Sequence, residues 1–278
     1  MHKRYTYSKI ESVKGNEMRV TYTNPGFDHS INSILLFQGD DTTPYWSDAL
    51  LYFYPQLSKK KMNGLTYEGK KEYLVEELKS VWDDLLCELN NKVELYNRQF
   101  GRFHEQIEDA LSETFEIDTR AIFNDIIGNI SLNPVCPRFL EERYFDIFYK
   151  NSERGAIGLS IHEIIHYIWF YVWNNHFGDS YSECETPSLK WILSEMVVES
   201  IMDDKRLASI NPYYPRENGG CVYRYFQDMI IHGKPILDTL RELHQGNHIT
   251  DYMELSYRYC LENEAAIRRH IKEAEKVF

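Results

Sequence analysis

Cysteine is scarce in this chain of 278 residues, and no two cysteines form a C-x-x-C pair. Disulfide scaffolds and thiolate zinc sites both need paired or closely spaced cysteines. The five present are odd in number and widely scattered, which argues against both kinds of framework and makes a reducing cytoplasm the expected compartment. They are Cys87, Cys136, Cys184, Cys221 and Cys260.

Long apolar runs are missing as well. A membrane-spanning helix needs about 18 or more consecutive apolar residues, and the sequence has no such run. The first twenty residues also lack the apolar core of a secretory signal peptide. We therefore expect a cytoplasmic protein that does not cross a membrane.

Positive charge is in deficit, with 31 Lys and Arg against 43 Asp and Glu and a formal net charge of −12. An acidic surface repels phosphate backbones and anionic lipid headgroups, so we expect neither nucleic acid nor a membrane as a partner. The glycine-rich loops that hold nucleotide phosphates, G-x-x-x-x-G-K-[ST] and G-x-G-x-x-G, are also absent.

Hydrophobic residues make up 43% of the chain, enough for a substantial core. Apolar side chains at three- and four-residue steps predict helix from Tyr67 to Glu116, with a second helical stretch beginning after Gly101. A proline after a threonine cap predicts another helix from Pro44. More helices are expected at 187–208, 222–231, 235–245 and 249–277.

Strands are expected in fewer places. The segments "EMRVTYTN" (17–24) and "RYFDIFYK" (143–150) have strand-like patterns, while the short apolar runs around "NDIIGNIS" (124–131) fit either strand or helix. The pattern as a whole predicts a helix-dominated α+β fold. A mixed, mainly helical region (1–121) would precede a catalytic region (122–278), and the two could also form one compact domain.

The segment "GLSIHEIIHYIWF" (158–170) is apolar on nearly every side, yet it contains two histidines and a glutamate. Buried polar groups need partners. His162 and His166 are four residues apart, so on a helix both imidazoles can reach one metal ion. Glu163 lies about 100° round the helix, where it can take a proton from a zinc-bound water whose pKa the metal lowers. This H-E-x-x-H pattern is typical of zinc hydrolases.

One comparison within the chain and one alternative limit this interpretation. The segment "HEQIE" (104–108) shares the first two positions of the motif but has Glu108 in place of the second histidine. The alternative for residues 162–166 is a pair of core histidines that are hydrogen-bonded to backbone or carboxylate groups.

A catalytic zinc has three protein ligands, so a third must lie elsewhere. The H-E-x-x-H-x-x-G-x-x-H arrangement is excluded, because Trp169 and Val172 occupy its glycine and third histidine positions. Glu195 and Glu199 are four apart in the apolar segment "SLKWILSEMVVESIMDD", where a cation would relieve their repulsion and desolvation. One could bind the metal while the other orients a histidine. Loop acids are weaker candidates: Asp179, Glu183 and Glu185.

"HEIIH" followed by "WILSEMVVE" resembles the gluzincins, the thermolysin-like branch of the zinc metallopeptidases. The resemblance covers only these two segments. It implies a zincin-like catalytic unit with a small sheet, an active-site helix and a helical C-terminal part. It also implies His162, His166 and Glu195 as zinc ligands, Glu163 as the base and Glu199 as the acid behind the ligands. A rival alignment makes Glu199 the ligand, with Asp203 four residues on.

The resulting hypothesis is a zinc-dependent metallopeptidase that acts on a peptide or protein substrate. The alternative is a non-catalytic zincin-like protein whose metal site is structural and which binds another protein. Such peptidases also use a group that stabilises the oxyanion, and a strand at the cleft edge that pairs with substrate. "RYFDIFYK" is the expected strand. Candidates for the oxyanion group are Tyr213, Tyr214, Tyr223, Tyr225, His232, His244 and His248.

Overall fold

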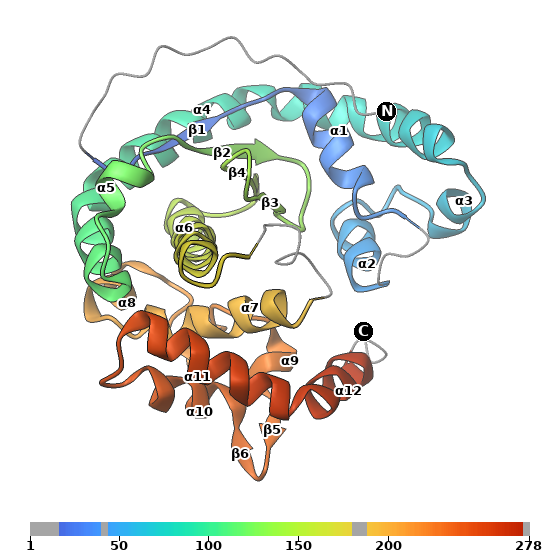
Figure 1. Cartoon of the computed structure of the whole chain (residues 1–278). Coiled ribbons are helices and arrows are strands. Elements are labelled where there is room, and N and C mark those ends of the chain that lie inside the picture. Colours follow the sequence, from blue (N-terminus) through green and yellow to red (C-terminus); the bar gives the residue numbers. More distant parts are fainter. Residues whose placement is uncertain (1–16, 40–43, 180–187, 275–278) are drawn as a thin grey trace.

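Helix α6 (Glu153–Phe177) lies at the centre of the molecule, enclosed by the other elements (Figure 1). The computed structural model describes residues 17–39, 44–179 and 188–274. Ser152 caps the start of α6 by accepting a hydrogen bond from the backbone N–H of Gly155, and Gly178 ends the helix in a left-handed conformation. Because α6 is apolar on nearly every side, it is buried along most of its length.

A small mixed sheet lies beside α6, with the strand order β1-β2-β4-β3. Strands β1 (Val20–Thr23), β2 (Ile126–Ser131) and β4 (Tyr144–Phe148) are parallel, and β3 (Arg138–Phe139) is antiparallel to β4. The strands expected at 17–24 and 143–150 are confirmed, and the open segment 124–131 forms a strand. The expected substrate-pairing role of "RYFDIFYK" is wrong, because β4 lies between β2 and β3 and has no free edge. On this side of the sheet the edge strand is β3.

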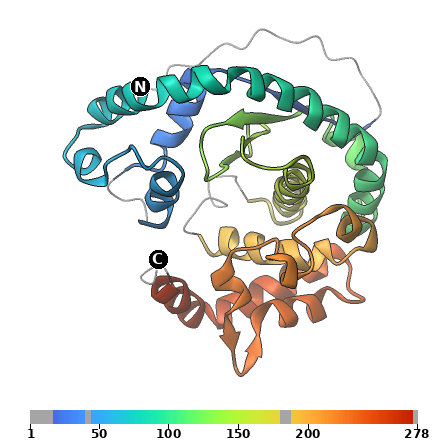
Figure 2. The same cartoon turned by 180° about the vertical axis from the view of Figure 1, so that it is seen from behind.

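Helix α4 (Tyr67–Phe115) is a single continuous helix of 49 residues. The expected second stretch after Gly101 is therefore part of the same helix. Its apolar side chains, such as Leu74, Leu78 and Leu89, face the core. Figures 1 and 2 show α4 curving around the sheet and α6, as long helices do when they wrap a core.

The two regions expected on either side of residue 122 share one sheet and one core. β1 comes from the first region and pairs with β2 from the second. α4 packs along α6, and the buried apolar residues of both regions form one hydrophobic cluster.

Helix α7 (Leu189–Met202) packs against α6 from the side opposite α4 (Figure 1). The expected helix 187–208 is interrupted after α7, where Asp204 caps the separate helix α8 (Lys205–Ile210). The expected helix 222–231 is mostly wrong, since only α9 (Arg224–Gln227) is helical there. β5 (Ile230–Ile231) pairs with β6 (Lys234–Pro235) in a hairpin.

The remaining C-terminal helices follow the expected ranges, with one break. α10 (Ile236–His244) matches 235–245, and Asn263 separates α11 (Ile249–Glu262) from α12 (Glu264–Ala274) within 249–277. At the other end of the chain, α2 begins at Pro44 as expected, while the predicted cap Thr43 lies outside the described residues. The other elements are α1 (Phe27–Leu35), α2 (Pro44–Phe53), α3 (Lys59–Asn63), α5 (Thr119–Ile122) and the 3-10 turn η2 (Arg216–Asn218).

The expected helix-dominated α+β class is confirmed. Within the described part of the chain, no helix is both long enough and apolar enough to span a bilayer.

The continuity of α4 gives a stability prediction. A methyl group at Gly101 would have no heavy atom within 4 Å, so Gly101→Ala should raise the free energy of unfolding by about 0.5–1 kcal/mol through helix propensity. Urea unfolding measures the change. Gly178→Ala is the opposite control, because Gly178 has φ of +72° and alanine there should destabilise. A loss of stability in Gly101→Ala would argue against a continuous helix.

Candidate metal centre

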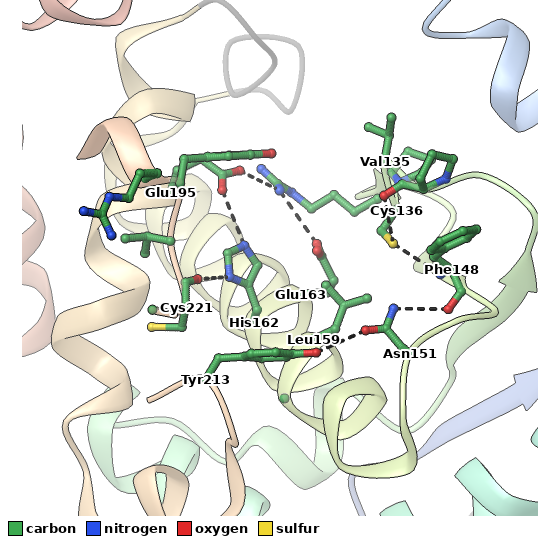
Figure 3. A pocket seen from close by; sticks show the side chains of 18 of the residues that line it. Val135, Cys136, Phe148, Asn151, Leu159, His162, Glu163, Glu195, Tyr213 and Cys221 are labelled. Atoms are coloured by element: carbon green, nitrogen blue, oxygen red, sulfur yellow. Dashed lines mark hydrogen bonds and ion pairs between the residues drawn. The ribbon is translucent and has the colours of Figure 1, made fainter. Parts of the chain in front are cut away.

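The packing of α6 on α7 brings three potential ligands together, His162, His166 and Glu195. Figure 3 shows two of them, His162 and Glu195, reaching toward each other from the two helices. The Nε2 atoms of His162 and His166 are 2.9 Å apart. Glu195 Oε2 lies 3.4 Å from His162 Nε2, and Glu195 Oε1 lies 3.5 Å from His166 Nε2. Among the described residues these three form the one histidine, cysteine and carboxylate group that could hold a metal ion, with ligand atoms within 4.8 Å of one another.

The donor set suits a small divalent cation. Ligand atoms about 2.1 Å from a tetrahedral zinc are about 3.4 Å from one another, and the three separations above bracket that value. Two imidazoles and one carboxylate are also a known ligand set of catalytic zinc. The same residues therefore fit zinc in both chemistry and spacing.

The ring of His162 is oriented by a backbone group. Its Nδ1 lies 2.9 Å from the carbonyl oxygen of Cys221, which can only accept a hydrogen bond. Nδ1 therefore carries the hydrogen, and Nε2 is directed toward His166 and Glu195. Metal-ligating histidines are commonly held in this way by a carbonyl or carboxylate.

His166 is fully buried, and its Nδ1 has no hydrogen-bond partner in the described structure. Burial and the nearby Arg138 guanidinium lower the pKa of His166 to about 3. Burial acts in the same direction on His162, but the hydrogen bond to Glu195 and the charge of Glu163 outweigh it and raise the pKa of His162. One imidazole thus stays neutral while its neighbour holds a proton more readily.

Glu163 lies beside the three ligands but is not one of them. Its side chain is buried and lines a cavity that His162 and Glu195 also line. Its Oε2 atom is 3.7 Å from Nη1 of Arg138. Burial raises the pKa of Glu163, and the charges of His162 and Arg138 oppose this rise only in part. The carboxylate is consequently a stronger base than an exposed glutamate.

Arg138 is a functional candidate that the sequence analysis missed. It extends from β3, and its NH1 donates to Glu195 Oε1 at 2.8 Å. Burial alone would raise the pKa of Glu195, but the positive charge of Arg138 and the hydrogen bonds with His162 and His166 hold it well below the usual value. The sequence feature that could have indicated this residue is a single arginine in the apolar run "VCPRFL". A cation in such a segment is expected to be buried and to need an acidic partner.

The backbone before Arg138 is unusual. Cys136 has φ of +55°, in the left-handed region, and Pro137 follows it. The Cys136 thiol accepts a hydrogen bond from the backbone N–H of Phe148 at 3.2 Å, and burial raises its pKa to about 12. Cys136 is therefore a structural thiol that helps to hold the turn leading into β3.

A cavity of about 610 Å³ opens beside two of the candidate ligands, His162 and Glu195. Its polar side includes His162, Glu163, Glu195 and Arg138. Of the seven oxyanion candidates, Tyr213 and Tyr223 line this cavity, and the other five are not among its lining residues. The apolar side chains on its wall include Phe37, Phe53, Val135, Leu140, Phe148 and Leu159.

Glu199 does not contact the histidines as the resemblance implied. Its carboxylate is 1% exposed and accepts hydrogen bonds from Arg216 and Arg241. The rival alignment is equally disfavoured, because Asp203 accepts a hydrogen bond from Tyr214 rather than supporting a ligand. Glu195, and not Glu199, is the acid that meets the histidines.

The weaker candidates lie elsewhere. Asp179 accepts hydrogen bonds from Trp173 and Lys190, and Glu183 and Glu185 lie outside the described residues. In the "HEQIE" segment, Glu108 binds the backbone N–H of Met18 and the side chain of Arg120.

Comparison of the chain with protein-family models, with curated proteins and with solved structures gave no match in any of the three.

The buried, neutral His166 predicts a pH-dependent stability in the metal-free protein. As pH falls through about 6.5 the unfolded chain protonates this residue, whereas the folded protein resists protonation down to about 3. Stability is therefore lost as pH falls, by about 2 kcal/mol between pH 7 and pH 5 for a group with these two pKa values.

Urea unfolding with a chelator present measures this loss. His166→Gln should remove that part of the pH dependence, and His176→Gln, on the exposed end of the same helix, should retain it. Equal slopes in the wild type and His166→Gln would contradict the assignment.

Proposed function

We propose that this protein is a zinc-dependent metallopeptidase of zincin-like architecture. The observation that carries the proposal is the meeting of His162, His166 and Glu195, of which His162 and Glu195 line a cavity together with a fourth buried group, Glu163. A purely structural zinc site is normally closed by four protein ligands. Three ligands next to a cavity and a basic carboxylate are instead the arrangement that hydrolysis needs.

A bound zinc ion supplies a Lewis acid that polarises the scissile carbonyl and lowers the pKa of water. Glu163 is the group that removes the proton from the attacking water and then delivers it to the leaving amine. Its buried position raises its pKa, which suits both parts of this task. Glu163 lines the cavity without being one of the three ligands, so it remains free for proton transfer.

Tyr223 is the candidate that best fits stabilisation of the oxyanion. It lines the cavity, and burial together with the charge of Glu195 raises its pKa well above 10. The phenol therefore keeps its proton and can donate a hydrogen bond to developing negative charge. Tyr213 also lines the cavity, and its hydroxyl donates to Asn151 at 3.3 Å.

The short edge strand β3 supports binding of an extended substrate. Its residues and their neighbours, 134–138 and 140, line the cavity. An antiparallel edge strand offers backbone groups to an extended peptide, which is how strand addition binds substrate. We therefore assign backbone pairing with the substrate to β3, in place of the "RYFDIFYK" segment that the sequence pattern favoured.

The first test is the role of Glu163. Glu163→Gln keeps the shape of the side chain but removes the base, so it should bind zinc with unchanged stoichiometry and lose about 10²–10⁴-fold in turnover of a peptide library. Glu105→Gln is the matched control, because it alters the same position of the "HEQIE" segment on the surface of α4. Full turnover by Glu163→Gln would favour the non-catalytic alternative.

The second test is the ligand set. Purified protein should bind about one zinc ion per chain, measured by elemental analysis. Glu195→Ala removes a direct ligand and should weaken zinc affinity by more than the roughly 10–100-fold typical of second-sphere substitutions. A metal-free protein that gains neither zinc nor stability when zinc is added would overturn the proposal.

A further inference from the structure

The loop between α8 and α9 (residues 211–223) carries the carbonyl that orients His162. The Cys221 carbonyl accepts from His162 Nδ1 at 2.9 Å (Figure 3), and no other partner of that nitrogen is present among the described residues. The ring orientation of His162 therefore depends on where this loop holds one peptide group.

The loop is held on both sides of Cys221. The side-chain amide of Gln227 donates to the carbonyls of Gly219 and Val222 at 3.1 and 2.9 Å. The backbone N–H of Gly220 donates to the Tyr213 carbonyl at 3.0 Å. Gly220 has φ of +81°, and a Cβ there would lie 2.2 Å from the Gln227 amide nitrogen. These contacts make residues 219–222 a tight and locally well-bonded turn.

Arg216 ties the same loop to the helix that carries Glu195. Its Nε lies 2.8 and 2.9 Å from the two carboxylate oxygens of Glu199, and its NH2 lies 2.5 Å from Oε1. NH2 also donates to Asp238 at 2.8 Å. A forked pair of this kind fixes both distance and orientation. Glu199 follows Glu195 by one helical turn on α7. The contact between Arg216 and Glu199 therefore fixes the position of the loop relative to Glu195.

We infer that Glu199 and Arg216 are positioning residues, which hold the 211–223 loop so that the Cys221 carbonyl fixes the ring of His162. Helix α7 then acts on the site twice: it presents Glu195 directly, and it orients a histidine through Arg216 and the loop. The inference rests on the proposed metal site, because it treats His162 as a ligand.

Arg241 makes a matched control possible. Its NH2 donates to the same Glu199 oxygen at 2.9 Å, but it comes from α10 and does not belong to the loop. Arg241→Met and Arg216→Met each remove one arginine from the buried carboxylate. Only Arg216→Met removes a contact that the loop itself makes with Glu199.

The experiment measures zinc affinity by competition with a chromophoric chelator. Arg216→Met should raise the zinc Kd by about 10–100-fold, whereas Arg241→Met should stay within about threefold of the wild type. Glu199→Gln should weaken binding in the same direction as Arg216→Met. The double variant Glu199→Gln/Arg216→Met should have a zinc Kd no higher than that of the single variant with the higher Kd, because both substitutions remove the same contact.

A second readout does not depend on zinc. In the metal-free protein, NMR of the histidine side chains should show the Nδ1–H form of His162 with a slowly exchanging proton. Arg216→Met should speed that exchange, and Arg241→Met should not. If the wild type bound no zinc, the proposed function would fail, yet this measurement would still decide whether Arg216 positions His162.

The inference is overturned if Arg216→Met keeps both the wild-type exchange rate and the wild-type Kd, or if Arg241→Met changes them equally. Should Arg216→Met fail to fold, Arg216→Lys keeps a charge for Glu199 but loses the forked geometry. It should then give an intermediate exchange rate and an intermediate Kd. A wild-type result for the lysine variant would count against a positioning role.

Discussion

The burial of Glu195 between two apolar helices is the interaction on which the rest of the site depends. A carboxylate that is 1% exposed cannot remain charged without close partners, and α6 and β3 provide them as His162, His166 and Arg138. The close packing of α6 on α7 sets their separations. The cavity, the base and the edge strand are all arranged around this charge.

A second buried carboxylate, Glu199, lies one turn further along α7. Glu199 is as buried as Glu195, but its partners are arginines from a loop and from α10, not histidines. The two acids of α7 therefore have different roles. Glu195 faces the candidate metal site, and Glu199 binds arginines from the neighbouring loop and from α10.

The sequence predicted the elements whose patterns are strongly periodic. The apolar steps of α4 and the dense apolar segment of α6 were sufficient. The spacing of His162 and His166 indicated a shared site, but it left Glu195 and Glu199 open as the third ligand, and only the resemblance to the gluzincins favoured Glu195. Contacts between distant segments could not be predicted, because no periodic pattern encodes them. Arg138 reaches the site from a two-residue strand, and the Cys221 carbonyl is a backbone group with no sequence signature. The partners of Glu199 were missed for the same reason, since they lie 17 and 42 residues further along the chain.

Arg138 has a consequence for the proposed metal site. Its guanidinium faces both Glu163 and Glu195, so part of their negative charge is balanced by the protein itself. Small zinc domains, in contrast, depend on the ion to fold at all. Here the fold rests on its own hydrophobic core, so the chain would stay folded with the proposed metal site empty.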